Sequence, residues 1–206
     1  MAHLISNLSE YGSIYDEVTM KINQCMDKTQ INQMKKMTLK VDLNGKGINA
    51  KLNKKNELIF TIETILLFEK NEKDPLFQLL SHRIARLFFK EAKNTGSFIS
   101  KRHKFFNMIE EVRADIEGKK IFQLADHEIS AAFASYKKYN CHQSKECCYN
   151  NGTLSYDERV TYILYNNSLN EKLIDTMFKY YVSEYPGKYI NPKLKLEAKK
   201  RYLLNR

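Results

Sequence analysis

The chain lacks the features that would point directly to a common class of protein. No glycine-rich phosphate loop is present, and no Ser or Cys sits in a recognisable nucleophile elbow. The longest apolar run, residues 58–68, is interrupted by Glu63 and falls short of the roughly 18 to 20 residues that span a bilayer. Residues 1–10 lack the basic and apolar segments of a secretion signal. These absences predict a cytoplasmic protein with no membrane partner.

Acidic residues are too few to balance the basic ones. The 34 Lys and Arg residues exceed the 24 Asp and Glu residues, so the formal net charge is +10. Residues 35–55 hold seven lysines against one aspartate, and residues 188–206 hold seven Lys or Arg against one glutamate. Such clusters attract nucleic acid or an acidic protein surface. The alternative is that these lysines form an ordinary solvated surface and that their number reflects an A/T-rich genome.

Cysteine is also scarce, and three of the four cysteines fall within eight residues. Cys141 and His142 precede Cys147 and Cys148, a set that could hold zinc. The spacing is irregular, however, and two adjacent cysteines do not readily bind one ion. A disulfide from Cys141 to Cys147 or Cys148 is a second alternative. We expect free thiols and no cofactor, as is usual in a cytosolic protein.

Enough apolar residues are present for a folded core, since 43% of the chain is hydrophobic and 12% is aromatic. Residues 37–43 alternate between apolar and polar, and residues 48–52 and 58–62 follow across polar turns, the first at Asn44-Gly45. This pattern predicts a small antiparallel β-meander.

Apolar residues at helical spacing predict helices over most of the rest of the chain. They fall within residues 6–35, 74–93, 101–122, 126–139, after Ser155, within 173–182 and after Pro192. Ser155 and Ser168 each stand three residues before a glutamate and so predict capping boxes, and Gly118 predicts a break or kink. We therefore predict one mainly helical α+β domain, residues 1–206. Residues 36–122 hold the meander and a helix pair, and residues 123–206 form a helical C-terminal part.

Two consecutive predicted helices carry polar motifs on apolar faces. The first contains His82-Arg83-Ile84-Ala85-Arg86, and the second contains Glu111-Val112-Arg113-Ala114-Asp115. Their order resembles the core of zincin metallopeptidases, where His-Glu-x-x-His supplies two zinc ligands and a later Glu-x-x-Ala-Asp helix supplies another. The resemblance covers residues 37–120 and implies a zincin-like core with strand 58–62 beside the first helix.

Two essential letters of the zincin motif are replaced by arginine. Arg83 stands where the general base belongs, and Arg86 stands where the second histidine belongs; a guanidinium can perform neither role. His82 and Glu111 alone are too few ligands for a catalytic zinc. If the helices pack as in a zincin, Arg86 would face Glu111 or Asp115 and an ion pair would fill the place of the metal. The alternative is two unrelated helices with exposed surface pairs.

These observations favour a catalytically silent zincin-like protein that binds a macromolecular partner, first of all a protein. The predicted contact surface is the basic, tyrosine-rich C-terminus: Lys188, Tyr189, Lys193, Lys195, Lys199, Lys200, Arg201 and Tyr202. The composition suits a phage or mobile element of a low-GC bacterium, with the protein inhibiting a host system.

Two alternatives remain open. One is a divergent metal-dependent hydrolase or peptidase that uses His82, Glu111 and Asp115, with a further ligand from Glu110 or His103. The other is nucleic-acid binding through residues 188–206, which would weaken steeply with salt.

Overall fold

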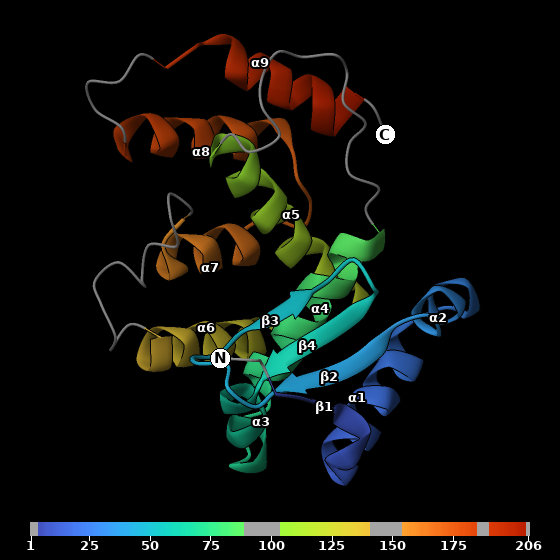
Figure 1. Ribbon diagram of the computed structural model, residues 1–206. Helices are drawn as coiled ribbons and strands as arrows, with labels where there is room; N and C mark the ends of the chain where they lie inside the picture. Colours follow the sequence, from blue (N-terminus) through green and yellow to red (C-terminus); the bar gives the residue numbers. More distant parts are fainter. Residues whose placement is uncertain (1–3, 89–103, 141–153, 185–189, 205–206) are drawn as a thin grey trace.

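A small mixed sheet forms one side of the molecule. The computed structural model describes residues 4–88, 104–140, 154–184 and 190–204. Its strands are β1 (Ile5–Asn7), β2 (Thr38–Asp42), β3 (Ala50–Leu52) and β4 (Glu57–Thr61), in the order β1-β2-β4-β3 (Figure 1). β2 pairs parallel with β4, while β1 and β3 pair antiparallel with β2 and β4.

The predicted antiparallel meander is wrong in its first pairing, although its three strands are present and the antiparallel pairing of residues 48–52 with 58–62 is confirmed by β3 and β4. The segment after β2 does not turn back at Asn44-Gly45 to pair with β2. It crosses the end of β4 instead, where the Thr61 hydroxyl donates a hydrogen bond to the Gly47 carbonyl at 2.7 Å. Gly45 lies so close that a Cβ there would come within 2.7 Å of Thr61 Cγ2. β3 therefore reaches the outer edge of β4, and β4 takes the place beside β2.

Helices make up most of the described chain, which confirms the mainly helical α+β class. They are α1 (Gly12–Cys25), α2 (Lys28–Met34), α3 (Ile62–Glu69), α4 (Asp74–Phe88), α5 (Lys104–Ile121), α6 (Asp126–Asn140), α7 (Tyr156–Leu164), α8 (Glu171–Glu184) and α9 (Lys193–Lys199). A 3-10 turn (Leu8–Glu10) follows β1, and a π-helical turn (Lys200–Leu204) follows α9. Within these ranges no helix is both long and apolar enough to cross a membrane.

Two of the C-terminal helices have a side-chain cap at their N-terminus. The Ser155 capping box precedes α7 as predicted, with the Ser155 hydroxyl accepting from the Glu158 amide and the Glu158 carboxylate accepting from the Ser155 amide. The predicted cap at Ser168 is wrong. α8 begins one residue after Asn170, whose side chain accepts a hydrogen bond from the Leu173 amide at 2.9 Å.

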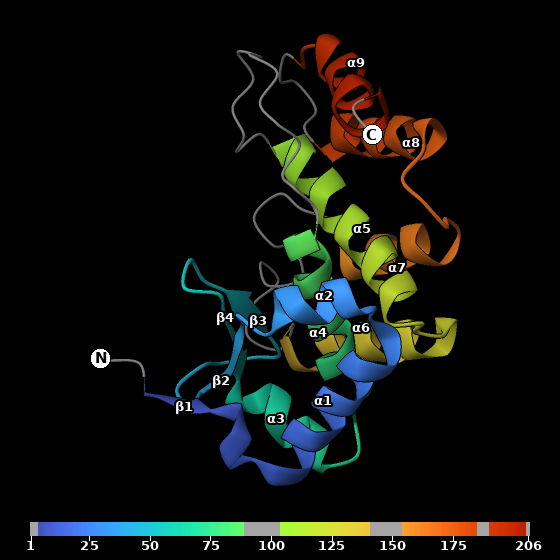
Figure 2. The ribbon, with the colours of Figure 1, turned by 90° about the vertical axis from the view of Figure 1, so that its right-hand side faces the viewer.

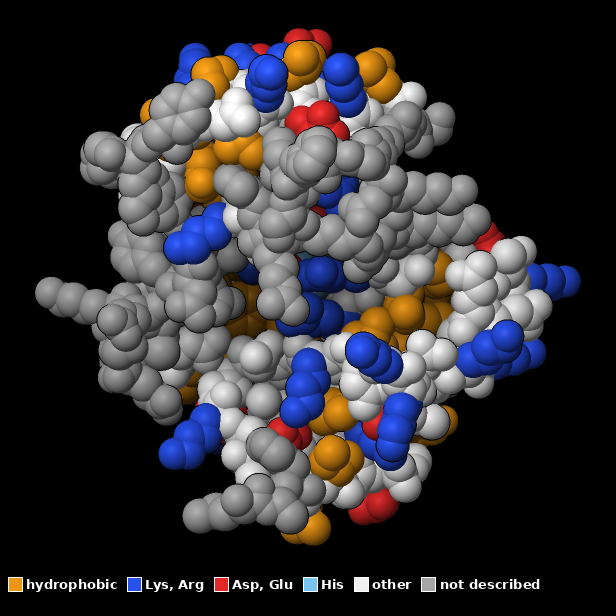
Figure 3. Space-filling model, turned by 45° about the horizontal axis from the view of Figure 1, so that its top comes forward, with side chains coloured by type: hydrophobic (Ala, Val, Ile, Leu, Met, Phe, Trp, Pro, Cys, Tyr) orange, Lys and Arg blue, Asp and Glu red, His pale blue; other side chains and the backbone are white. Residues whose placement is uncertain are grey.

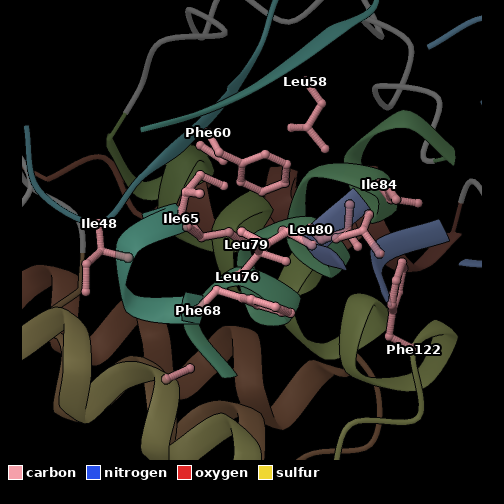
Figure 4. Close-up of a cluster of buried hydrophobic side chains, with 14 of the residues drawn as sticks. Ile48, Leu58, Phe60, Ile65, Phe68, Leu76, Leu79, Leu80, Ile84 and Phe122 are labelled. Carbon is pink, nitrogen blue, oxygen red and sulfur yellow. The ribbon is translucent and has the colours of Figure 1, made fainter. Parts of the chain in front are cut away.

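One hydrophobic core lies between the sheet and its helices. Leu58 and Phe60 of β4 are fully buried and belong to the same cluster as Leu76, Leu80 and Ile84 of α4 (Figure 4). Burial of each such side chain contributes about 1.5–3 kcal/mol. Figure 2 shows α1, α3, α4 and α6 on the same side of the sheet. This core fixes α4, which carries the first motif.

A second core joins α5 to the C-terminal helices. Its buried members include Phe105, Ile109, Val112, Met177 and Tyr202, from α5, α8 and the turn after α9. Figures 1 and 2 both show α5 running from the part that carries the sheet to the part that carries α8 and α9. α5 therefore ties the two cores together and carries the second motif between them.

α4 and α5 approach each other closely at Gly118, where the predicted break is wrong because α5 continues to Ile121. A Cβ at Gly118 would lie 2.8 Å from the Ser81 carbonyl and 3.1 Å from the His82 amide nitrogen. Only glycine permits this approach without a shift of one helix. The contact lies at His82 itself, so it brings the two motifs together.

Candidate functional site

His82 and Asp115 form a buried pair between α4 and α5. His82 is 2% exposed and Asp115 is 1% exposed. His82 Nδ1 lies 2.6 Å from Asp115 Oδ1, and a carboxylate oxygen there accepts the proton of Nδ1. This contact fixes the orientation of the imidazole ring and turns Nε2 away from Asp115.

Arg159 of α7 completes the surroundings of Asp115. Its Nε donates to Asp115 Oδ2 at 2.5 Å, and its Nη2 donates to Asp115 Oδ1 at 3.0 Å. The guanidinium also lies over the Phe133 ring, 5.5 Å from the centroid. Sequence reasoning missed Arg159. The signal in the sequence was its place four residues before Ile163, on the face of α7 that is buried.

Gln78 and Tyr136 extend the network into the core. Gln78 Nε2 donates to Asp115 Oδ1 at 2.9 Å, and the Tyr136 hydroxyl donates to Gln78 Oε1 at 2.6 Å. Burial alone would raise the pKa of Asp115, but the charges of Arg159 and His82 and their hydrogen bonds lower it to about 2. Burial raises the pKa of Tyr136 well above its usual value, so Tyr136 stays a neutral donor.

Arg86 and Glu111 form the outer part of the cluster. Arg86 Nη1 donates to Glu111 Oε1, and Glu111 Oε2 lies 3.3 Å from Arg159 Nη2 and 3.4 Å from His82 Nε2. Burial raises the pKa of Glu111, but the charges of His82, Arg159 and Arg86 outweigh it and lower the pKa overall. The structure thus brings Arg86 to Glu111, whereas Asp115 pairs with Arg159 and His82.

Neither Glu110, a further candidate zinc ligand, nor Cys25 belongs to this cluster. Glu110 is near Tyr202, where burial and then the charge of Glu110 raise the pKa of the tyrosine. Cys25 is a half-buried free thiol whose Sγ donates to the Phe122 carbonyl at 3.4 Å. His103 lies outside the described residues, as do Cys141, His142, Cys147 and Cys148. In the part of the chain that the structure describes, no group of three or more His, Cys, Asp or Glu side chains is placed to hold a metal.

The residues of the cluster do not fit a zinc ion. His82 Nε2 and Glu111 Oε2 face each other, but Arg86 and Arg159 already contact the Glu111 carboxylate. A divalent cation at this point would meet both guanidinium groups at close range. Each pair of unit charges about 4 Å apart interacts by about 4 kcal/mol at an effective dielectric constant near 20.

A cavity of about 240 Å³ opens beside His82. It is lined by residues of the β2–β3 segment, α4, α5, α6 and α7: Lys46, Gly47, Ile48, Asn49, Gln78, Leu79, His82, Arg83, Glu111, Tyr136, Asn140, Tyr156 and Arg159. Three cationic side chains, those of Lys46, Arg83 and Arg159, therefore line it with one carboxylate. Figure 3 shows a face on which Lys and Arg side chains predominate over Asp and Glu.

Two polar atoms of cavity residues have no hydrogen-bond partner. Arg83 Nε and His82 Nε2 are both buried and make no hydrogen bond, although His82 Nε2 lies 3.4 Å from Glu111 Oε2. Burial lowers the pKa of Arg83; the nearby Glu111 carboxylate opposes this shift, and the Arg86 and Arg159 charges add to it. The guanidinium charge is therefore poorly compensated by its surroundings.

Asn140 at the end of α6 holds the segment that carries Lys46. Its Oδ1 accepts from the Ile48 amide at 2.7 Å, and its Nδ2 donates to the Ile48 carbonyl at 3.1 Å. The Gly47 amide donates to Glu63 Oε2 at 2.5 Å, and Gly47 has a φ of +71°, which favours glycine. The edge of the cavity at Lys46 is thus fixed by hydrogen bonds to α3 and α6.

The predicted C-terminal contact surface is partly wrong. Tyr202 is 2% exposed and packs in the second core. Lys195 and Lys199 pair with Asp175 at 3.5 and 2.9 Å, and Lys199 also pairs with Glu171 at 2.5 Å. These contacts neutralise much of the helix.

Other members of that surface differ in their environment. Arg201 lies over the rings of Phe106 and Tyr202, whereas Lys193 and Lys200 are exposed. Lys188 and Tyr189 fall outside the described residues.

No family model, curated protein or solved structure matches this chain. The zincin-like resemblance therefore stays a prediction that rests on the motif residues of α4 and α5.

Proposed function

We propose that the protein is a non-catalytic, zincin-like binding protein that acts on a macromolecular partner, and that its contact site is the cationic cavity. The observation that carries the proposal is the pairing of Asp115 and Glu111 with Arg159 and Arg86. In a zincin, carboxylates at these positions serve the metal and its surroundings. Here guanidinium groups neutralise both, so the cluster works as a rigid support for α4, α5 and α7.

The charge of the cavity favours an acidic partner. Lys46, Arg83 and Arg159 line it from three separate elements, and the whole chain carries a formal charge of +10. Such a field raises the association rate with an acidic surface and disfavours basic ones. A protein partner is the first choice, and an inhibitor of a host system encoded by a phage or mobile element is the setting that the composition suits.

The test combines metal binding with partner binding. Full-length protein is titrated with zinc by calorimetry and assayed for peptide hydrolysis, and we expect neither tight zinc binding nor turnover. Partners captured by the wild type are then purified and titrated against Arg83→Glu and against Lys193→Glu, a control on the exposed C-terminal face. We expect Arg83→Glu alone to abolish binding. Zinc-dependent hydrolysis that is lost in His82→Ala and Glu111→Ala would overturn the proposal.

A hydrolase is the second candidate, and one observation favours it. Asp115 orients His82, a residue that lines the cavity, and His82 Nε2 makes no hydrogen bond, although it lies 3.4 Å from Glu111 Oε2; a carboxylate orients a histidine general base in the same way. In that case His82 would move a proton at Nε2 while Arg83 bound an anionic substrate group. Turnover that is lost in His82→Gln, with folding retained, would establish this alternative.

A further inference from the structure

The cationic cavity has features of a built site for one small anionic group. Its volume of about 240 Å³ is below the range of about 300–1,000 Å³ typical of sites for whole drug-sized ligands. Its lining is polar and basic rather than apolar. A single charged group at the end of a larger molecule therefore suits it better than a complete cofactor does.

We propose that this cavity binds a terminal phosphate group through Lys46, Arg83 and His82, with Arg159 behind them. The inference rests on the proposed function, because it takes the same cavity as the contact site and names the chemistry of the group that enters it.

The donors approach from different elements, which suits a tetrahedral group with three free oxygens. Lys46 comes from the segment between β2 and β3, Arg83 and His82 come from α4, and Arg159 comes from α7. A carboxylate offers two oxygens and a phosphate monoester offers three, so a phosphate has one more oxygen for donors that approach from separate directions. A phosphate can therefore pair with Lys46 and Arg83 through different oxygens.

The unpaired atoms supply the second, independent observation. The buried Arg83 Nε has no hydrogen-bond partner, and His82, only 2% exposed, makes no hydrogen bond at Nε2, which lies 3.4 Å from Glu111 Oε2. A buried polar atom without a hydrogen-bond partner destabilises the protein, so a ligand that pairs with it recovers that cost. A phosphate monoester, with a second pKa near 6, can donate to Nε2 or accept from it near neutral pH.

Arg83 is in an environment that an anion would improve. Burial and the nearby Arg86 and Arg159 charges lower the pKa of Arg83 against the opposing carboxylates. A phosphate beside Arg83 would compensate this charge in a partly desolvated place, where ionic hydrogen bonds are strong. The terminal phosphate is either the free ion or a phosphoserine side chain of a protein partner.

The test is calorimetric titration of the full-length protein at constant pH and ionic strength. The probes are inorganic phosphate, a phosphoserine peptide, its unphosphorylated form, acetate and a 5′-phosphorylated oligonucleotide. We expect one phosphate per chain, at least tenfold weaker binding in Arg83→Gln, about threefold weaker binding in Lys46→Gln, and no change in Lys193→Gln. Lys46 is exposed, so Lys46→Gln is expected to fold even if Arg83→Gln does not.

The probes separate the sources of the phosphate. Binding of the phosphopeptide at least tenfold more tightly than inorganic phosphate assigns the group to a protein partner, and equal binding assigns it to the free ion. Tightest binding of the oligonucleotide would overturn the choice of a protein partner. Equal binding of acetate and phosphate, or unchanged phosphate binding in both Arg83→Gln and Lys46→Gln, would overturn the phosphate site. The proposed function would survive that result, because its partner and zinc experiments do not use phosphate.

Discussion

At the scale of single residues, Asp115 decides how the cluster is organised. Its two oxygens accept from His82, Gln78 and Arg159 although the side chain is fully buried. A buried charge is tolerated only where such partners surround it. The pH and the partners of Asp115 should therefore both have measurable effects on stability.

Acid should remove the contribution of Asp115. The pKa of Asp115 is about 2 in the folded protein, against an ordinary value of 3.8. Because the folded pKa is the lower one, the stabilisation is complete above about pH 4 and is lost as the pH falls toward 2. The shift corresponds to about 2 kcal/mol in the free energy of unfolding.

Urea denaturation of the wild type and of Asp115→Asn between about pH 6 and pH 2 measures this loss. The variant should be less stable at neutral pH and should lose less stability on acidification. Equal losses in the two proteins would contradict the assignment.

The two arginines of the cluster should differ in importance. Arg159→Ala leaves Asp115 buried without its main counter-charge, and we expect a loss of about 3–5 kcal/mol in the free energy of unfolding. Arg86 is 42% exposed at its side chain, so Arg86→Ala should cost no more than about 1 kcal/mol. Chemical denaturation of both variants compares them directly. A larger loss for Arg86→Ala would mean that the outer pair supports the cluster.

At the scale of elements, the contact between α4 and α5 depends on a missing side chain. Alanine normally stabilises a helix interior by about 0.5–1 kcal/mol relative to glycine. At Gly118 the added Cβ would approach the Ser81 backbone, and the helices would have to separate at His82. We therefore expect Gly118→Ala to destabilise the protein by about 1–3 kcal/mol.

Thermal denaturation of Gly118→Ala and of a matched control measures this effect. At Gly12, the first residue of α1, an added Cβ would meet nothing within 4 Å, so Gly12→Ala should leave the melting temperature nearly unchanged. A Gly118→Ala protein as stable as the wild type would show that α4 can move away from α5 at little cost.

Local patterns predicted the elements better than their arrangement. Helical spacing and the Ser155 capping box predicted α4, α6 and α7 because these signals lie within one helix. The sheet order depends on the contact of Gly47 with Thr61 and of Ile48 with Asn140, which is 92 residues away in sequence. The spacing of apolar residues along the sequence carries no information about such distant contacts. The sequence therefore predicts a meander, whereas the structure has a mixed sheet.

At the scale of the whole molecule, the site lies where the two cores meet. α5 supplies buried residues to the second core and packs against the first through Ile121 at its end, and α4 and α7 contact α5 from the part that carries the sheet. The sequence predicted His82, Arg86, Glu111 and Asp115 because one motif order connects α4 with α5. Arg159 was missed because it comes from a third helix, and Tyr202 was misassigned because its exposure depends on how the turn after α9 packs on Phe106 of α5.

The same arrangement of helices allows the zincin-like ancestry to be tested by restoring the two motif residues that are replaced by arginine. Arg83→Glu with Arg86→His recreates His-Glu-x-x-His on α4, opposite Glu111 on α5. The double variant removes two cations and adds one ligand, so we expect it to bind one zinc at least a hundredfold more tightly than the wild type, by calorimetry. Adding Glu111→Gln should abolish most of that gain. A folded double variant with no gain in zinc affinity would mean that α4 and α5 do not share the zincin geometry and that the motif order is a coincidence.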